Sequence, residues 1–570
     1  MLSPLFGSNL SRILPLPDAN ETQSFSAQFS RVMNIVSQLK WNIAAPAKNF
    51  TLGSLFRSYL LPVFFLAGCA VKMTGNERLI SDCSGANCGS KGSQYKGSGL
   101  GIWTYENKGK APKALKVSLS GLEHNQVTLM FSNLSEYPQP MPKGLVNRGG
   151  NKNPVFPHYQ PNMLDPIPTD VTDQRHGPVE RKTWKVPQMG KNNQADKPID
   201  FPSTLRGETT IGQFTYKLWV ADQEWTSHAQ KTIPYLTAML FGTPEYPSML
   251  KQYLDDFAVQ PWGNYPNTPD NNLLIAPDLR TINMVIAPNG GGAVQFFDSE
   301  QMIKSPTSNQ ALVVFAGSDL FSCKGIPEGL CLDAENRDLA FALTNNLLHE
   351  LTHLIHYYHR AVMLGVKQRF EPWLEEAVAA SHGYVVALSR FPHTAAYNKE
   401  FTSWFSGNYV CPLNSTDGRP GTDIQDKKCS QNYYKSTQAF LVFLVQQYGT
   451  GFYRELLKAN GIGIDVLDEA IRSSGGVGFN EAFRRWGSTL ALPDAKHLPA
   501  GYDYKSIKVG DYFLPTVNLN DFSPFRQLLP TLPEKIEPYS HLPLVDHDQS
   551  GHYLREIEIP SGVALTVYIN

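Results

Sequence analysis

The chain has 570 residues, of which 42% are hydrophobic and 18% are charged. These values are typical of globular proteins, and the length is too great for one hydrophobic core, so we expect two to four domains. The formal net charge of −1 gives no electrostatic reason to expect a nucleic-acid partner.

Residues 1–69 are predicted to be an export signal. Basic residues precede an apolar run at 59–69, which is too short to span a bilayer. The end of this run, Leu66–Cys69, resembles a bacterial lipobox. It implies that Cys69 carries lipid and anchors an exported protein on the periplasmic or cell-surface face of a membrane; a buried apolar segment is the alternative. Because the signal begins late, we hypothesise a downstream start, for example at Met33.

Six further cysteines fall into three pairs that are close in sequence: Cys83 and Cys88, Cys323 and Cys331, Cys411 and Cys429. Local disulfides are the simplest of the pairings that six cysteines allow. Disulfides persist in oxidising compartments, which agrees with export. A second metal site is the alternative, although the chain contains no C-x-x-C pair.

Three segments are predicted between the signal and residue 208. Residues 70–98 are rich in Gly and Ser and indicate a flexible tether. Residues 99–137 favour a small β domain, with strands at 102–105, 115–119 and 126–131. Residues 138–207 are crowded with Pro, Asn, Gly and Lys and indicate an irregular linker or insertion. An activation or inhibitory segment is equally compatible with that composition.

A large domain is predicted over residues 208–492. Its early part contains expected strands and one interrupted helix, at 214–220, 231–258 with a break at 242–247, 281–287, 290–298 and 311–316. After about residue 384 the pattern is mostly helical, with helices expected to end at Gly449 and to span 479–492.

One helix in this domain carries the strongest chemical signal, His349-Glu350-Leu351-Thr352-His353. Leucines recur around it at three- and four-residue steps, as the buried stripe of an amphipathic helix does. Two histidines four residues apart point the same way from a helix and can share one zinc ion. Glu350 would then lie beside the metal, where its carboxylate can take a proton from the attacking water. A structural histidine pair is the alternative.

A third metal ligand has two candidates. His359 lies ten residues after His349, as in the metzincin motif H-E-x-x-H-x-x-G-x-x-H. That motif breaks its helix at a Gly, but His356 stands there, so we expect the helix to continue and His359 to face away. The segment 373–379 is similar to the motif W-L-x-E-G/A-x-A of zincins whose third ligand is Glu. In that register Glu376 is the ligand and Glu375 points outward.

The stretch from about 280 to 490 resembles the hyicolysin family of secreted zinc metalloproteases, which have a thermolysin-like core. The resemblance rests on ordered features: the strand 281–287, a Gly-Gly-aromatic strand at 290–298, Ser308-Asn309 before the strand 311–316, the zinc helix, the Glu helix and the segment 433–444. It implies an α+β fold in which a zincin-like catalytic domain, with a mixed sheet, an active-site helix and a helical subdomain, is flanked by small β domains.

The resemblance also implies site residues and one departure. The edge strand at Gly292, Ala293 and Val294 would pair with the substrate backbone, although an ordinary hairpin edge is equally compatible. Tyr434, in preference to Tyr433, would donate its hydroxyl to the oxyanion; aromatic packing is the alternative. In thermolysin an Asp four residues after the Glu ligand orients a zinc histidine. Ala380 stands there, so support for the histidine must come from elsewhere.

The C-terminal region, residues 493–570, is Pro-rich and then β-rich, with strands expected at 553–560 and 563–570. Overall, we expect a lipid-anchored zinc endopeptidase that holds one zinc ion, acts on proteins or peptides and contacts a membrane through its anchor. A zinc aminopeptidase is an alternative, but the chain has no G-x-M-E-N-like motif to hold a free amine. A non-catalytic surface adhesin with a protease-like fold is the third candidate. Calcium has no D-x-D-x-D-G loop to support it.

Overall fold

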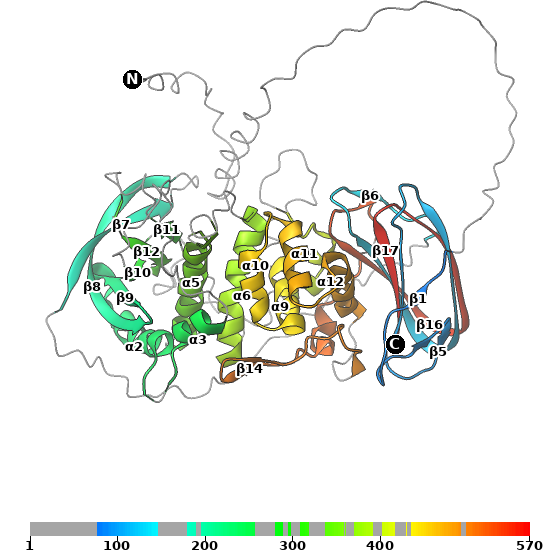
Figure 1. Ribbon diagram of the computed structural model, residues 1–570, viewed down its shortest axis with the longest axis horizontal. Helices are drawn as coiled ribbons and strands as arrows, with labels where there is room; N and C mark the ends of the chain where they lie inside the picture. The colour runs from blue at the N-terminus through cyan, green and yellow to red at the C-terminus, as the bar shows by residue number, and fades with distance from the viewer. Residues whose placement is uncertain are drawn as a thin grey trace, which may run out of the picture.

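Two β-sheets flank a helical centre in the computed structural model (Figure 1). The structure describes residues 77–145, 179–189, 195–244, 246–256, 280–288, 294–297, 308–309, 311–318, 337–357, 359–360, 370–390, 402–415, 429, 435–491, 497–529 and 531–570. The predicted signal, with Met33 and Cys69, lies outside these residues. Within them, every helix is too short or too polar to cross a bilayer. The architecture is a mixed α/β fold.

The first sheet has six strands in the order β11-β12-β10-β9-β8-β7. Their bounds are β7 Arg181–Met189, β8 Ala195–Ile211, β9 Phe214–Ala221, β10 Thr281–Ala287, β11 Val294–Phe297 and β12 Leu312–Gly317. β10 is parallel to both β9 and β12, whereas β11 pairs antiparallel with β12 at the edge. The strands expected around 214–220, 281–287 and 311–316 are therefore present, with ends within one residue of the expected ones.

Both faces of β10 are buried, which agrees with its mostly apolar sequence. Ile282, Met284 and Ile286 join the large core shared with the helices, while Val285 packs with Trp219 in a smaller core on the opposite face. Successive side chains of a strand point to opposite faces, so a strand buried on both sides favours apolar residues at consecutive positions. The buried polar residue of β10, Asn283, is hydrogen-bonded to Trp219 and to the carbonyl of Leu312.

Part of the segment expected to be an irregular linker forms strands instead. β7 and the first part of β8 fall within residues 138–207 and pair antiparallel. β7 is the outer strand of its sheet, and its pairing shifts register between Val186 and Gln188, around Pro187. Proline lacks the N–H of a ladder hydrogen bond and is tolerated at edges and bulges. A composition typical of loops is thus compatible with an edge hairpin.

The helices form the centre of the molecule and one side of the first sheet (Figure 1). Their bounds are α2 Ser227–Phe241, α3 Met249–Asp256, α5 Arg337–His356, α6 Pro372–Arg390, α9 Ser436–Tyr448, α10 Gly451–Lys458, α11 Ile464–Ser473 and α12 Phe479–Trp486. The break expected at 242–247 separates α2 from α3, with Gly242 at φ 84°. Gly449 follows α9, and its N–H donates to the carbonyl of Val445. The helix expected over 479–492 is α12 followed by a 3₁₀ turn at Gly487–Ala491.

The second sheet has seven strands in the order β1-β4-β17-β5-β3-β2, with β16 paired to β5. Their bounds are β1 Ile80–Ser81, β2 Ser90–Lys91, β3 Gln94–Tyr95, β4 Gly101–Glu106, β5 Lys113–Asn133, β16 His541–Ile559 and β17 Val563–Ile569. The two strands expected at 115–119 and 126–131 are one continuous strand, β5. Short pairs complete the fold: β6 Gln139–Pro140 with β15 Lys535–Ile536, and β13 Ile507–Val509 with β14 Tyr512–Leu514.

The last strand of the chain lies between two strands from near its start. β17 pairs antiparallel with β4 on one side and with β5 on the other, and all seven of its residues are buried. The sequence analysis placed these strands in separate regions, residues 99–137 and 493–570. Strand pairing joins them in one sheet. The backbone N–H and C=O groups on the facing edges of β4 and β5 need partners, and β17 supplies them.

Two of the three cysteine pairs close in sequence form disulfides, Cys83–Cys88 and Cys411–Cys429. Cys323 and Cys331 lie outside the described residues. Cys83 follows β1 and Cys411 follows a 3₁₀ turn at Asn408–Val410, so each disulfide closes a short loop.

His541, the first residue of β16, lies between the second sheet and the helices. Its ring is fully buried and stacks on Phe483 of α12 at a centroid distance of 4.2 Å. Its Nδ1 lies 2.8 Å from the hydroxyl oxygen of Ser132 on β5. Burial disfavours the charged imidazolium and lowers the pKa of His541 to about 3.

This burial predicts acid sensitivity. An unfolded histidine titrates near about 6.5, so between that pH and about 3 the unfolded chain binds a proton that the folded chain does not. The free energy of unfolding should therefore fall on acidification, by about 3 kcal/mol from this residue between pH 7 and pH 4.5. We expect His541→Gln to remove that part of the pH dependence, as measured by denaturation across this range.

The matched control is His552→Gln, an exposed histidine on the same strand. It should keep the wild-type pH dependence. Equal slopes of stability against pH for wild type and His541→Gln would contradict the assignment.

Candidate metal centre

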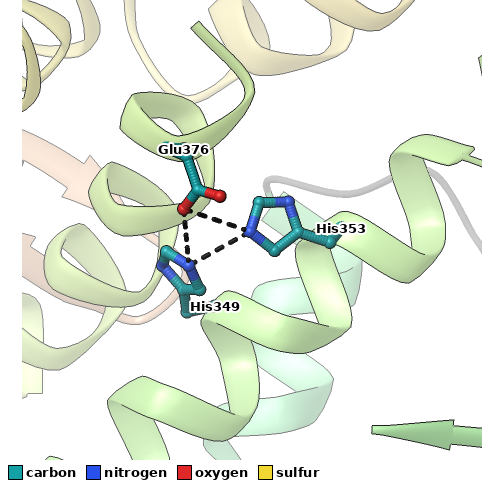
Figure 2. Close-up of side chains that lie close together, drawn as sticks. All are labelled: His349, His353 and Glu376. Carbon is teal, nitrogen blue, oxygen red and sulfur yellow. Dashed lines mark hydrogen bonds and ion pairs between the residues drawn. The ribbon is translucent and has the colours of Figure 1, made fainter. Parts of the chain in front are cut away.

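Three side chains from two helices converge on one point. His349 and His353 lie on successive turns of α5, and Glu376 faces them from the neighbouring helix α6 (Figure 2). The two histidine Nε2 atoms are 3.1 Å apart. Oε2 of Glu376 lies 3.4 Å from Nε2 of His349 and 3.5 Å from Nε2 of His353. Each residue thus presents one ligand atom to a common centre.

The dimensions of this triangle fit a zinc ion. Metal–ligand distances of about 2.0–2.1 Å in a tetrahedral site place ligand atoms about 3.3 Å from one another. The three measured distances, 3.1 to 3.5 Å, bracket that value. Two imidazoles and one carboxylate are also a donor set that zinc prefers, and it leaves a fourth position open. Within the described part of the chain, His349, His353 and Glu376 are the group that could hold a metal.

Glu350 stands beside this group. Its Oε1 lies 3.9 Å from Nε2 of His349, and the residue is 4% exposed. Burial raises the pKa of Glu350 to about 7, although the neighbouring His349 and His353 act in the opposite direction. The carboxylate is therefore next to the metal ligands without being one of them.

α5 is fixed on the side opposite the ligands by its leucine stripe. Leu343, Leu347, Leu351 and Leu354 are fully buried in the large core, as the three- and four-residue spacing predicts. Thr352 adds a polar contact, since its hydroxyl lies 2.7 Å from that of Tyr253 on α3. The orientation of the ligand-bearing face thus follows from burial of the other face.

α6 approaches α5 closely because small residues face the contact. Ala377 and Ala380 are buried. At Gly383 a Cβ would lie 2.2 Å from the side-chain oxygen of Asn345 and 3.0 Å from its backbone oxygen. Since Asn345 precedes His349 by one helical turn, the glycine sets the separation of the two ligand-bearing helices.

The side chain of Glu375 does not point outward as expected. The motif register placed it pointing outward, but its side chain is only 17% exposed and its Oε1 lies 3.0 Å from Nδ1 of His353. The same oxygen is 3.4 Å from Nδ1 of His356. The prediction of an outward carboxylate was wrong because α6 lies across α5 closely enough for consecutive residues, Glu375 and Glu376, to reach opposite edges of the His353 ring.

A second row of aromatic and histidine rings lies behind Glu375. His356 packs edge-on to Phe370 and, at 5.7 Å, to His382 of α6. The ring of His382 in turn lies tilted against that of Tyr453 of α10, at a centroid distance of 3.7 Å. His356 and His382 are both buried. The sequence analysis missed this row. The signal was present for His356, which is three residues after His353 and therefore on the same side of the helix.

His359, the competing third ligand, is not part of the metal-capable group. The chain continues in a helical turn at residues 359–360, as expected without a glycine at position 356. His359 is buried, and burial, with the charges of His356 and Arg360, lowers its pKa to about 4. The next residue, Arg360, donates to the carbonyls of Leu457 and Ala459 at the end of α10.

The charges within the group stabilise one another. Burial by itself would raise the pKa of Glu376 and of Glu375, but the histidines beside them hold both values below the usual range. Burial by itself would lower the pKa of His353, yet the charge of Glu376 and the contact with Glu375 raise it. Each buried carboxylate thus has an imidazole partner, as buried charges require.

Of the remaining predicted site residues, the structure describes Val294. Tyr433, Tyr434, Gly292 and Ala293 lie outside the described residues. Val294 is the first residue of β11, where its backbone pairs with Phe315 of β12.

The family model described as Peptidase M30 matches residues 204–570, well over half of the chain. The chain belongs to the peptidase M30 family. The resemblance to the hyicolysin family of metallopeptidases is thereby confirmed at family level. A second model, described as Domain of unknown function (DUF8571), matches residues 81–144. No curated protein matches this chain.

Membership of the M30 family makes the chain a peptidase, with proteins or peptides as its substrates. Zinc dependence is typical of the family, and the His349, His353 and Glu376 group is where a metal could bind.

Widening the gap between the two helices should weaken the centre. We expect Gly383→Ala to cost about 1–3 kcal/mol of stability, as overpacking does, and to lower zinc affinity because it moves Glu376 away from the histidines. Thermal denaturation and zinc titration would measure both effects. Gly451→Ala is the control, since a Cβ there meets nothing within 4 Å in the first turn of α10. Unchanged zinc affinity in Gly383→Ala would contradict the argument.

Removing the third ligand should deplete the metal. We expect Glu376→Ala or His353→Ala to abolish stoichiometric zinc, measured by elemental analysis of the purified protein, because two ligands hold zinc far more weakly than three. His359→Ala should retain zinc. Full zinc in Glu376→Ala, with loss in His359→Ala, would transfer the ligand role to His359.

Proposed function

We propose that this M30 peptidase is a zinc-dependent endopeptidase with a zincin-like catalytic domain within residues 208–492. The observation that carries the proposal is the convergence of His349, His353 and Glu376 within 3.5 Å of one another, with Glu350 alongside. The mixed sheet, with β11 at its edge, and the helices after α6 support the proposal.

The roles of the residues follow from their positions. His349, His353 and Glu376 would hold the zinc. When bound, the ion supplies Lewis acidity that lowers the pKa of water and polarises a carbonyl. Glu350 would accept the proton of the attacking water at a carboxylate oxygen and later give it to the leaving amine nitrogen. Its burial keeps bulk water away from that proton transfer.

Substrate contacts are proposed from position in the sheet. Among the described strands β11 is the outermost, beside β12, and we propose that an extended peptide pairs with its outer edge, with Gly292, Ala293 and Val294 as the contact residues. Tyr434, shortly before α9, is proposed to donate its hydroxyl to the oxyanion of the tetrahedral intermediate.

An endopeptidase is favoured over the alternatives on sequence grounds. An aminopeptidase must bind the free amine of its substrate, and the chain lacks a G-x-M-E-N-like motif for that purpose. A non-catalytic adhesin would have no need for the general base, yet Glu350 is present beside an intact ligand set.

We propose that the protein is exported and anchored to a membrane by lipid. The lipobox-like Leu66–Cys69 supports lipid attachment at Cys69 and exposure on a periplasmic or surface face. The disulfides Cys83–Cys88 and Cys411–Cys429 suit an oxidising compartment.

Replacing the general base tests the mechanism. We expect Glu350→Gln to keep zinc and to lose at least about 100-fold in hydrolysis, since the amide cannot accept the proton. The assay is cleavage of an internally quenched peptide with a blocked N-terminus, together with zinc analysis. The control, Glu455→Gln on the surface of α10, should retain wild-type activity. Undiminished cleavage by Glu350→Gln would remove the general-base assignment, and failure of wild type to cleave any blocked peptide would favour the alternatives.

A further inference from the structure

We infer that Glu375 is a positioning residue for the metal centre: its carboxylate holds the imidazole of His353 with Nε2 facing the metal. The inference rests on the proposed zinc site and deepens it.

The two nitrogens of the His353 ring face different partners. Nδ1 lies 3.0 Å from Oε1 of Glu375, while Nε2 lies 3.1 Å and 3.5 Å from the ligand atoms of His349 and Glu376. A neutral imidazole has one N–H and one lone pair. A carboxylate can only accept, so it fixes the proton on Nδ1 and leaves the lone pair on Nε2 for the metal.

Glu375 lies close to a second histidine. Its Oε1 also lies 3.4 Å from Nδ1 of His356, one turn further along α5. The carboxylate thus hydrogen-bonds to His353 and lies within ion-pair distance of His356 on the same helix face, and its side chain is 17% exposed. His356 is itself confined between Phe370 and His382. Little freedom is left for Glu375 to turn away.

The chain lacks a carboxylate at the position from which thermolysin supports a zinc histidine. The thermolysin-type position for a supporting carboxylate, four residues after the Glu ligand, is Ala380. Ala380 is buried and has no polar side chain. Glu375 supplies the missing contact from the other direction along α6, immediately before the ligand Glu376. Two consecutive residues thus serve as ligand and as support for a ligand.

A buried carboxylate is costly to ionise unless its charge is compensated. A divalent cation on Nε2 of His353 would polarise the Nδ1–H bond and strengthen its contact with Glu375, so metal and carboxylate stabilise each other through the ring. Residues of this kind change metal affinity by about 10–100-fold when removed.

The test compares zinc affinity in the full chain, by competition with a chromophoric chelator, for wild type, Glu375→Ala, Glu375→Gln and Glu371→Ala. We expect Glu375→Ala to weaken zinc binding by about 10–100-fold. Glu375→Gln should recover part of the loss, because its amide oxygen still accepts from Nδ1 without the charge. Glu371, just before α6, contacts Trp373 and not His353, so Glu371→Ala should lower stability alone.

A spectroscopic readout separates positioning from general stability. Cobalt substituted for zinc has a visible spectrum that depends on ligand geometry, and this spectrum should change in Glu375→Ala but not in Glu371→Ala. Zinc affinity in Glu375→Ala within two-fold of wild type, or equal losses in Glu371→Ala, would overturn the inference.

The outcomes also distinguish this inference from the proposed function. Zinc binding by wild type without cleavage of any peptide would end the endopeptidase proposal and leave the affinity comparison for Glu375 intact. Absence of zinc from the wild-type protein would overturn both.

Discussion

The close packing of α5 against α6 is the contact on which the candidate centre depends. Both candidate histidine ligands come from one helix and the candidate carboxylate ligand from the other, so a single helix–helix separation sets the distances between them. Gly383, Ala377 and the buried leucines of α5 fix that separation and the rotation of α5. A displacement of 1 Å between two such elements is enough to misplace reacting groups.

Charge is the second constraint. Glu350, Glu375 and Glu376 are gathered within a largely buried region, where three unpaired carboxylates would be strongly destabilising. The arrangement gives each of them a histidine or a place beside the proposed cation. This explains why α6 contributes two consecutive acidic residues without loss of packing, and why the histidines continue along α5 to His356.

Local patterns in the sequence were sufficient for the parts of the site that depend on one helix. The four-residue spacing of His349 and His353 and the leucine stripe predicted the orientation of α5, and the fold bears this out. The direction of Glu375 was not predictable in this way, because it depends on how α6 crosses α5. The strands at the edge of the first sheet were missed for a similar reason: Pro187 reads as loop composition until its place on an outer strand is known.

The pairing of β17 shows why sequence boundaries and folding units differ in this chain. The M30 match begins at residue 204 and includes β16 and β17, whereas the DUF8571 match covers β4 and β5. β17 nevertheless lies between β4 and β5, and Ile102 and Tyr568 of this sheet share the large core with Leu351 of the metal-bearing helix. Neither matched segment contains all the strands of this sheet, so the sheet is complete only when both segments are present. α9 and α12 lie between this sheet and the helices α5 and α6 that carry the candidate ligands (Figure 1), and Phe483 of α12 stacks on His541 of β16.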